Sequence, residues 1–181
     1  MGASDWDYFV PYQSDINKAL QELREQVFRN DRYYSPKPTR VINTDDPATM
    51  PEMVRKQLLY LMEHQIGVDD KGAHKPPTTK LPTTIEELIA LNGEEGTHSI
   101  LDIDTIASSP SFGVGAPLSK EELIQFFGTD QPTHAMIDEK KRELSRSLQK
   151  SLGRYKYEAT YVIVYRDDMP DEIFFTGYSG D

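Results

Sequence analysis

The order of apolar and polar positions predicts a helix directly behind the N-terminal residues. Apolar side chains recur three and four positions apart, with charged side chains between them: Ile16, Ala19, Leu20, Leu23, Val27 and Phe28. This spacing places one apolar stripe along a helix and is typical of a surface helix that packs on a core. We therefore predict a helix over residues 14–29, with Ser14 as its N-cap.

Four further segments carry helix signals. Each begins near a residue suited to capping, and each ends near a glycine, which is a usual C-terminal residue. The predicted helices cover about 49–65, 84–92, 119–128 and 132–152. Thr83 or Thr84 is the expected cap of the second, and Ser119 with Glu122 forms a capping box for the third.

Three segments have the composition of β-strands. Residues 6–12 are aromatic and branched, and residues 99–106 are rich in isoleucine between turn residues. From 155 to 166 one parity is mostly tyrosine, and this alternation predicts a strand. The chain turns after residue 166, and residues 172–178 return as a partner strand, so a hairpin is predicted at the C-terminal end.

The remaining stretches predict loops. Residues 29–47 contain repeated proline, asparagine and aspartate turn signals. Residues 68–82 are polar, proline-rich and longer than an ordinary connection, so we expect a mobile flap or a linker there. Residues 112–117 contain Gly113 and Gly115 and are expected to form a glycine loop.

These elements predict an α+β fold in a single compact domain over residues 1–181, with the flexible Pro-rich loop 68–82 inside it. The expected sheet is small and mainly antiparallel. It consists of the C-terminal hairpin and residues 99–106, with residues 6–12 as a further candidate strand. About five helices cover the sheet, and we expect them on one face.

The charge balance indicates which partners to expect. The chain has 20 Lys and Arg against 30 Asp and Glu, a formal charge of 20 − 30 = −10. A surplus of negative charge repels phosphate backbones and anionic lipid, and it attracts basic proteins. We therefore expect a basic protein partner and no binding to nucleic acid or membrane.

The absence of cysteine excludes several kinds of chemistry. A chain without cysteine has no disulfide framework, no thiolate zinc site and no cysteine nucleophile. The N-terminal residues also lack the features of a secretory signal, and no apolar run approaches the ~18–20 residues needed to cross a bilayer. These features predict a soluble, cytoplasmic protein.

The segment 98–104 holds the candidates for catalysis. In a strand, residues of equal parity point to one face, which would place His98, Asp102 and Asp104 in a row. A cation shared by the two aspartates needs help from a neighbouring strand, because they would lie about 6.5–7 Å apart. Glu95, or its neighbour Glu94, is a candidate base in the preceding glycine-flanked loop. Alternatively, these carboxylates simply face solvent.

No cofactor motif is present in the sequence. Gly113 and Gly115 precede a helix start at Ser119, but their spacing matches neither a Walker motif nor a dinucleotide fingerprint. His64, His74 and His134 have no second histidine at the spacing of a ligand pair. We predict no cofactor and assign no metal.

Tyrosines provide a second group of candidate functional residues. Tyr155, Tyr157 and Tyr161 share one parity of the predicted C-terminal strand, and tyrosine suits a surface that is partly apolar and partly wet. Tyr33 and Tyr34 lie next to each other in a predicted loop. All five are candidate partner contacts, although the strand tyrosines could equally pack under the helices.

Two functional hypotheses follow. The first is a non-enzymatic acidic module that engages a basic partner protein, of a regulatory or toxin-neutralising type. The second is a small hydrolase or metal-dependent enzyme that uses His98 with Asp102 and Asp104, assisted by Glu95. An enzyme needs the histidine and carboxylates to converge in a pocket, whereas a binding module allows them to diverge.

Overall fold

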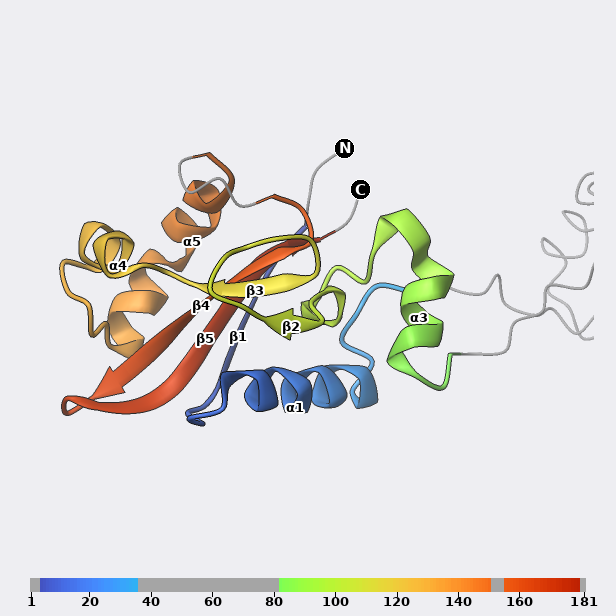
Figure 1. Cartoon of the computed structure of the whole chain (residues 1–181), viewed down its shortest axis with the longest axis horizontal. Coiled ribbons are helices and arrows are strands. Elements are labelled where there is room, and N and C mark those ends of the chain that lie inside the picture. Colours follow the sequence, from blue (N-terminus) through green and yellow to red (C-terminus); the bar gives the residue numbers. More distant parts are fainter. Residues whose placement is uncertain (1–3, 36–81, 151–154, 180–181) are drawn as a thin grey trace, which may run out of the picture. The chain divides into compact units, whose positions relative to one another are not determined.

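The computed structural model describes residues 4–35, 82–150 and 155–179. The helix predicted at 49–65 and nearly all of the loop predicted at 68–82 lie outside the described residues, as do His64 and His74. The described residues form five strands and four α-helices (Figure 1). The α+β class is therefore confirmed, whereas the single domain stays a prediction.

The strands form one sheet in the order β1-β5-β4-β3-β2. Their bounds are Ser4–Pro11 (β1), Thr105–Ile106 (β2), Val114–Pro117 (β3), Glu158–Arg166 (β4) and Met169–Ser179 (β5). β5 pairs antiparallel with β1 and β4, but the β4-β3 and β3-β2 pairs are parallel. The sheet is mixed rather than mainly antiparallel, because the chain between β3 and β4 is long enough for a crossover.

The predicted C-terminal hairpin is confirmed. Asp167 and Asp168 connect β4 and β5 with φ values of 51° and 63°. A two-residue turn with two positive φ values twists in the same sense as the strands, and aspartate tolerates this conformation. The tyrosine alternation begins earlier than the strand itself, because β4 starts at Glu158 and leaves Tyr155 and Tyr157 before it.

The first predicted helix is confirmed as α1 (Ile16–Arg29). Its cap is Asp15 rather than Ser14, because the Asp15 carboxylate accepts the Lys18 N–H at 2.9 Å. Both residue types are good caps, so the sequence alone did not separate these neighbours.

The other described helices begin and end near the predicted signals. They are α3 (Ile85–Asn92), capped by Thr84; α4 (Lys120–Phe127), with the Ser119–Glu122 capping box; and α5 (His134–Lys150). Gly128 ends α4 in the left-handed conformation. None of the helices in the described part of the chain combines the length and hydropathy that a membrane crossing requires.

The strand predicted at 99–106 is wrong for most of its length. A 3₁₀ turn, η2 (Gly93–Glu95), follows α3, and a second, η3 (Ile100–Asp102), occupies the middle of the predicted strand. Only β2 at its end is extended. Side-chain bonds to the local backbone explain the difference, since Ser99 accepts the Leu101 N–H and Asp102 accepts the Thr97 N–H.

The predicted glycine loop at 112–117 contains a strand, β3. A Cβ atom on Gly115 would lie 2.9 Å from Ile106 Cδ1 and 3.7 Å from Ala159 Cβ, so glycine allows both neighbouring strands to come close. Glycine in a strand often marks such a close approach. This contact is non-local, and the local sequence gave no sign of it.

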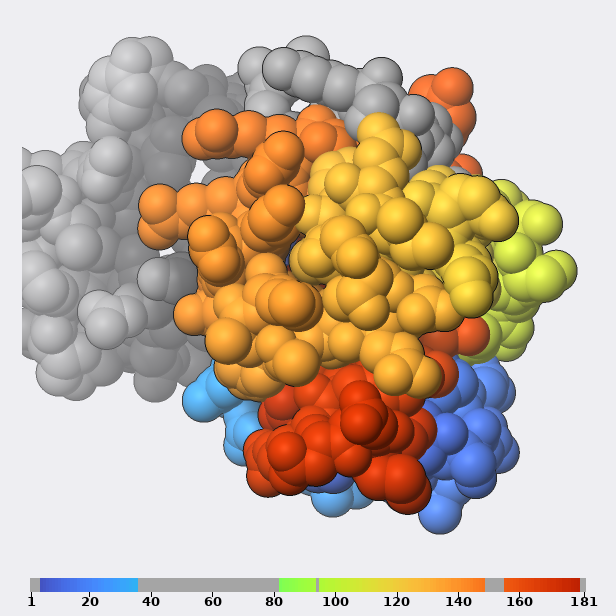
Figure 2. Space-filling model, turned by 90° about the vertical axis from the view of Figure 1, so that its left-hand side faces the viewer, coloured from blue at the N-terminus to red at the C-terminus, as the bar shows by residue number. Residues whose placement is uncertain are grey.

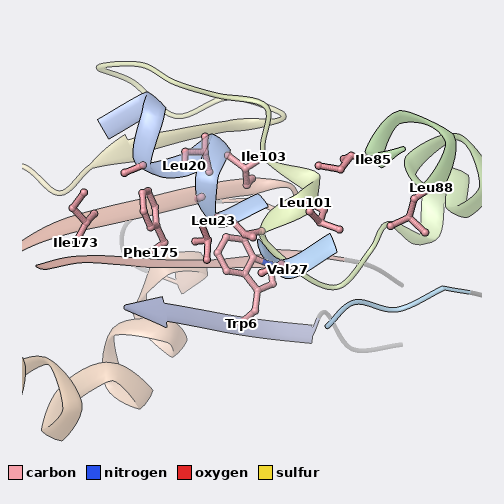
Figure 3. Close-up of a cluster of buried hydrophobic side chains, with 13 residues drawn as sticks. Trp6, Leu20, Leu23, Val27, Ile85, Leu88, Leu101, Ile103, Ile173 and Phe175 are labelled. Atoms are coloured by element: carbon pink, nitrogen blue, oxygen red, sulfur yellow. The ribbon is translucent and has the colours of Figure 1, made fainter. Parts of the chain in front are cut away.

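Helices cover both faces of the sheet, which corrects the expectation of one covered face. On one face α1 and η3 pack over Trp6, Ile173 and Phe175, and α3 adds Ile85 and Leu88 to the same core beside η3 (Figure 3). On the other face α4 and α5 pack over Val162, Val164 and Phe174. Figure 2 faces the latter helices, whose yellow and orange atoms lie on one side of the red hairpin.

The sequence of β5 explains why both faces are covered. Ile173, Phe174 and Phe175 are consecutive, and all three side chains are completely buried. Successive side chains of a strand point to opposite faces, so an uninterrupted apolar run requires cover on both sides.

Candidate functional site

The described residues form a partly open pocket of about 410 Å³ beside the end of α3. It is lined by Ile89, Gly93, Gly96, Asp102, Asp104, Phe112 and Tyr157. These residues come from α3, η2, η3, the loop before β3 and the residues before β4. The irregular segments of the fold therefore meet around one cavity.

Two glycines allow the chain to pass close to the pocket side chains. Gly96 has φ +68°, and a Cβ atom there would lie 2.7 Å from Tyr157 Cε1 and 3.1 Å from Asp102 Oδ2. Gly113 has φ +73°, and a Cβ atom there would lie 3.3 Å from Asp104 Oδ2. Glycine suits both positions because it has no Cβ and adopts positive φ readily.

Tyr157 adopts a strained backbone conformation at the pocket wall. Its φ is 64°. His98, which lies two residues before η3, also has a positive φ, of 52°. The left-handed region costs a residue with a Cβ about 1–2 kcal/mol. The surrounding sheet holds Tyr157 there, since its N–H donates to Tyr178 O at 2.9 Å and its carbonyl accepts the Gly113 N–H at 2.7 Å.

Asp102 places a nearly buried carboxylate in the pocket wall. The residue is 9% exposed, and its Oδ1 and Oδ2 lie 2.8 and 3.1 Å from the Thr97 nitrogen. A carboxylate has about four acceptor sites, so one shared N–H leaves acceptor capacity. The arrangement fixes the Asp102 side chain and keeps an anionic oxygen at the cavity.

Asp104 forms an ion pair with a buried arginine of α1. Arg24 Nη2 lies 3.1 Å from Asp104 Oδ1, and the Asp104 side chain is 71% exposed whereas that of Arg24 is 9% exposed. Arg24 also donates to Gln21 Oε1 and Leu101 O, and Gln21 donates to the Asp104 carbonyl. These bonds fix the position of Asp104 against α1.

Ser99, the N-cap of η3, connects this turn to β5. Its hydroxyl lies 2.8 Å from Thr97 Oγ1, and its carbonyl accepts the Ser179 hydroxyl at 3.4 Å. Ser179 in turn accepts the Trp6 indole N–H at 2.9 Å. The segment that contains the pocket carboxylates is thereby attached to β1 and β5.

Asn92, the last residue of α3, links two separate backbone segments through its side chain. Its Nδ2 donates to Tyr34 O at 2.7 Å and to Gly96 O at 2.8 Å. Within the ranges that the structure describes, Asn92 Oδ1 and Arg24 Nε are the buried side-chain atoms without a hydrogen-bond partner. Both flank the same irregular segment, so this part of the fold is less completely satisfied than the rest.

The predicted catalytic residues do not form one cluster. Asp102 and Asp104 share the pocket, but His98 is not among its lining residues: its Nδ1 lies 2.9 Å from Ser4 Oγ and its ring packs on Tyr34 at 4.8 Å. Glu95 accepts the Tyr34 hydroxyl at 3.3 Å. The row expected along a strand is absent because η3 replaces the strand.

Within the described residues, no group of three or more His, Asp or Glu side chains lies close enough together to hold a metal ion. The arrangement of these side chains therefore adds no support to the hypothesis of a metal-dependent enzyme.

The five candidate tyrosines have different environments. Tyr161 belongs to the core and packs on Phe175 at 6.1 Å, and its burial raises the pKa of its hydroxyl. Tyr33 stacks on Phe28 at 5.8 Å. The more exposed tyrosines are Tyr34 at 41% and Tyr155 at 67%, and Tyr157 lines the pocket. Tyr155, Tyr157 and Tyr161 do not form the single strand face that their parity predicted, because β4 begins at Glu158.

Sequence reasoning missed Phe112 as a site residue. Its ring is 77% exposed and lies 5.1 Å from the ring of Tyr157 at an angle of 50°. Phe112 lies in the predicted glycine loop, where an isolated aromatic residue next to Gly113 was the available signal. Its partner Tyr157 lies 45 residues further along the chain, so the pairing was not visible locally.

The segment that supplies most of the pocket lining carries acidic side chains without basic ones. Between Lys80 and Lys120 the chain contains 39 residues with no Lys or Arg and with six carboxylates, a formal charge of 0 − 6 = −6. The six are Glu86, Glu87, Glu94, Glu95, Asp102 and Asp104. This acidic segment, residues 81–119, supplies six of the seven pocket-lining residues.

Comparison with known protein families, curated proteins and solved structures finds no match to this chain.

Proposed function

We propose that the protein is a non-enzymatic binding module that engages a basic partner protein through the acidic segment. The observation that carries this proposal is the charge distribution: 39 consecutive residues hold six carboxylates without one Lys or Arg, and the same residues supply six of the seven that line the pocket. A one-sided field of this kind attracts oppositely charged partners and raises their association rate.

Exposed apolar side chains on the same segment support a protein partner. Phe112 is 77% exposed and Leu91 is 52% exposed. Tyr34, which is 41% exposed, adjoins the segment through its bond to Glu95. Aromatic side chains are enriched at the centres of protein interfaces, and polar residues surround them at the rim.

The carboxylates themselves support binding more than catalysis. Glu86, Glu87, Glu95 and Asp104 are exposed, whereas Asp102 is held by a backbone N–H. The hydrolase or metal-dependent alternative stays a prediction, and the geometry gives it less support because His98 lies outside the pocket lining.

The test is an affinity capture followed by a measurement with purified components. The tagged full chain retrieves partners from its native cell, and the binding of each purified partner is then measured at increasing salt. We expect at least one basic protein whose association rate falls steeply with ionic strength.

A matched pair of charge variants locates the interaction. Glu86→Gln with Glu95→Gln removes two charges from the acidic segment, and Glu139→Gln with Glu143→Gln removes two from α5. The first variant is expected to lower the association rate clearly more than the second. Equal effects, or binding that does not respond to salt, would contradict the proposal.

A further inference from the structure

The pocket is large enough to admit the end of a long side chain. Its volume of about 410 Å³ lies near the small end of the roughly 300–1,000 Å³ that is usual for ligand pockets. The pocket lies within the acidic segment that we propose to face a basic protein. A protruding side chain of that protein is therefore an occupant of suitable size.

The aromatic wall favours a cation. Phe112 exposes three quarters of its surface although it pairs with Tyr157, so one part of its ring remains open to an incoming group. The faces of aromatic rings attract cations, and the attraction is larger for a guanidinium that stacks on the ring.

Two carboxylates in the pocket lining leave it with excess negative charge. Asp102 and Asp104 contribute −2 and the adjacent Arg24 contributes +1, which leaves −1. Asp102 is nearly buried and accepts the Thr97 N–H. A nearly buried carboxylate is stabilised by a cation, because burial removes the water that would otherwise solvate it.

The pocket is held open by its own backbone. A Cβ atom on Gly96 would lie 2.7 Å from Tyr157 Cε1. Tyr157 itself is fixed at positive φ by its hydrogen bonds to Tyr178 in β5 and to Gly113 in the loop before β3. Such preorganisation reduces the entropy cost of binding, because the walls do not have to be ordered by the ligand.

From this geometry we infer that the pocket binds the guanidinium group of an arginine side chain on the partner protein. The inference rests on the proposed function and specifies its central contact. The planar guanidinium stacks on Phe112 and Tyr157 and donates to the carboxylates of Asp102 and Asp104. Lysine fits less well, because its ammonium is a strongly hydrated point charge that does not stack.

The test uses short peptides and the intact protein. The probe is the capped peptide Gly-Gly-Arg-Gly-Gly, and the comparison peptides carry citrulline or lysine in place of arginine. Binding is followed by the amide signals of Gly96, Gly113 and Tyr157 in ¹⁵N-correlated NMR spectra. We expect the arginine peptide to shift these signals and to bind roughly tenfold more tightly than the neutral citrulline peptide.

Two exposed pocket residues supply variants with matched controls. Phe112→Ala is expected to lower the affinity for the arginine peptide by about threefold to thirtyfold, whereas Met169→Ala in the hairpin leaves this affinity unchanged. Asp104→Asn is expected to weaken it by about threefold to tenfold, whereas Asp168→Asn in the hairpin turn has no effect. Phe112 and Asp104 are largely exposed, and Arg24 keeps its bonds to Gln21 and Leu101 when Asp104 loses its charge, so neither substitution is expected to unfold the protein.

The outcomes separate this inference from the proposed function. Equal binding of the arginine, lysine and citrulline peptides, or shifts that do not involve the pocket, would overturn the arginine site. If a basic partner binds Phe112→Ala and Asp104→Asn as it binds the native protein, the arginine site is wrong while the proposed function stands. If the arginine peptide occupies the pocket but no basic protein binds the acidic segment in a salt-dependent way, the site stands and the proposed function fails.

Discussion

The two sides of the sheet are built differently, although both are closed by buried apolar side chains. Under α4 and α5 the structure is regular, with a complete capping box and a left-handed glycine at the end of α4. Under α1 and α3 it is completed by the 3₁₀ turns η2 and η3. The strained residues His98 and Tyr157 belong to this second side.

The charges differ in the same way. α5 carries five Lys or Arg and three Asp or Glu, a balance of 5 − 3 = +2, whereas the acidic segment carries −6. Acids are paired with bases on both sides, as Lys120 is with Asp130 at 2.7 Å on the regular side and Arg29 is with Glu25 at 3.2 Å in α1, so the difference lies in the acidic segment, which has no base of its own.

This difference shows where the fold departs from what stability alone requires. Capped helices and paired charges agree with the local sequence, which is the usual state of a stable fold. Positive φ at Tyr157, partnerless buried atoms and unbalanced carboxylates each cost free energy. Their concentration around one pocket is typical of a functional site.

The largest expected effects test whether both sides are equally closed. Phe174 and Phe175 are adjacent, completely buried, and belong to the cores on opposite faces. We expect Phe174→Ala and Phe175→Ala each to lower the free energy of unfolding by about 3–5 kcal/mol, measured by urea denaturation. A cost for Phe175→Ala of less than half that for Phe174→Ala would show that the pocket side lacks a closed core.

The next effect concerns the glycine at the pocket. Gly96→Ala combines an unfavourable positive φ with a Cβ atom 2.7 Å from the Tyr157 ring, and we expect a loss of about 3–4 kcal/mol. Gly128→Ala is the control, because that glycine has φ +75° but no atom within 4 Å of the Cβ position. The control should lose about 1–2 kcal/mol in the same denaturation experiment. Equal losses would mean that the close contact at the pocket contributes nothing.

Sequence patterns predicted the regular side and the hairpin better than the pocket side. Ser119, Glu122 and Gly128 define α4 through contacts within a few residues, and alternation along β4 defines the hairpin. The strand prediction at 99–106 failed because Asp102 bonds back to Thr97, which favours η3 over an extended chain. The isoleucines of this segment indicate that it is buried. They favour an extended conformation only weakly, because the strand propensity of isoleucine depends on its context.

The candidate site was predicted in part. Asp102, Asp104 and Tyr157 were each identified, but in two separate groups with different roles. Their meeting depends on contacts between distant segments, such as Arg24 with Asp104 and Phe112 with Tyr157. No local pattern encodes such contacts, so the pocket became visible only with the tertiary structure.

A moderate effect is expected at the residue that joins the segments behind the pocket. Asn92→Ala removes two donors and leaves the carbonyls of Tyr34 and Gly96 without them. We expect a loss of about 1–3 kcal/mol in the free energy of unfolding, together with faster hydrogen exchange at the amide of Tyr34. Unchanged exchange at that amide would show that Asn92 does not hold the pocket side together.

The smallest effect is a pH dependence specific to the pocket side of the sheet. Burial raises the pKa of Tyr8 and Tyr161, both of which pack on the α1 core, above the ordinary value of 10.0. A raised pKa in the folded state means that the unfolded chain releases its protons first, so this stability is present below about pH 10 and is lost as pH rises above it. Tyr161→Phe should therefore flatten the fall in urea midpoint between about pH 9 and pH 11, whereas Tyr155→Phe, at an exposed position, should not. If the urea midpoint falls equally in Tyr161→Phe and in the native protein, burial of this hydroxyl does not contribute to the loss of stability at alkaline pH.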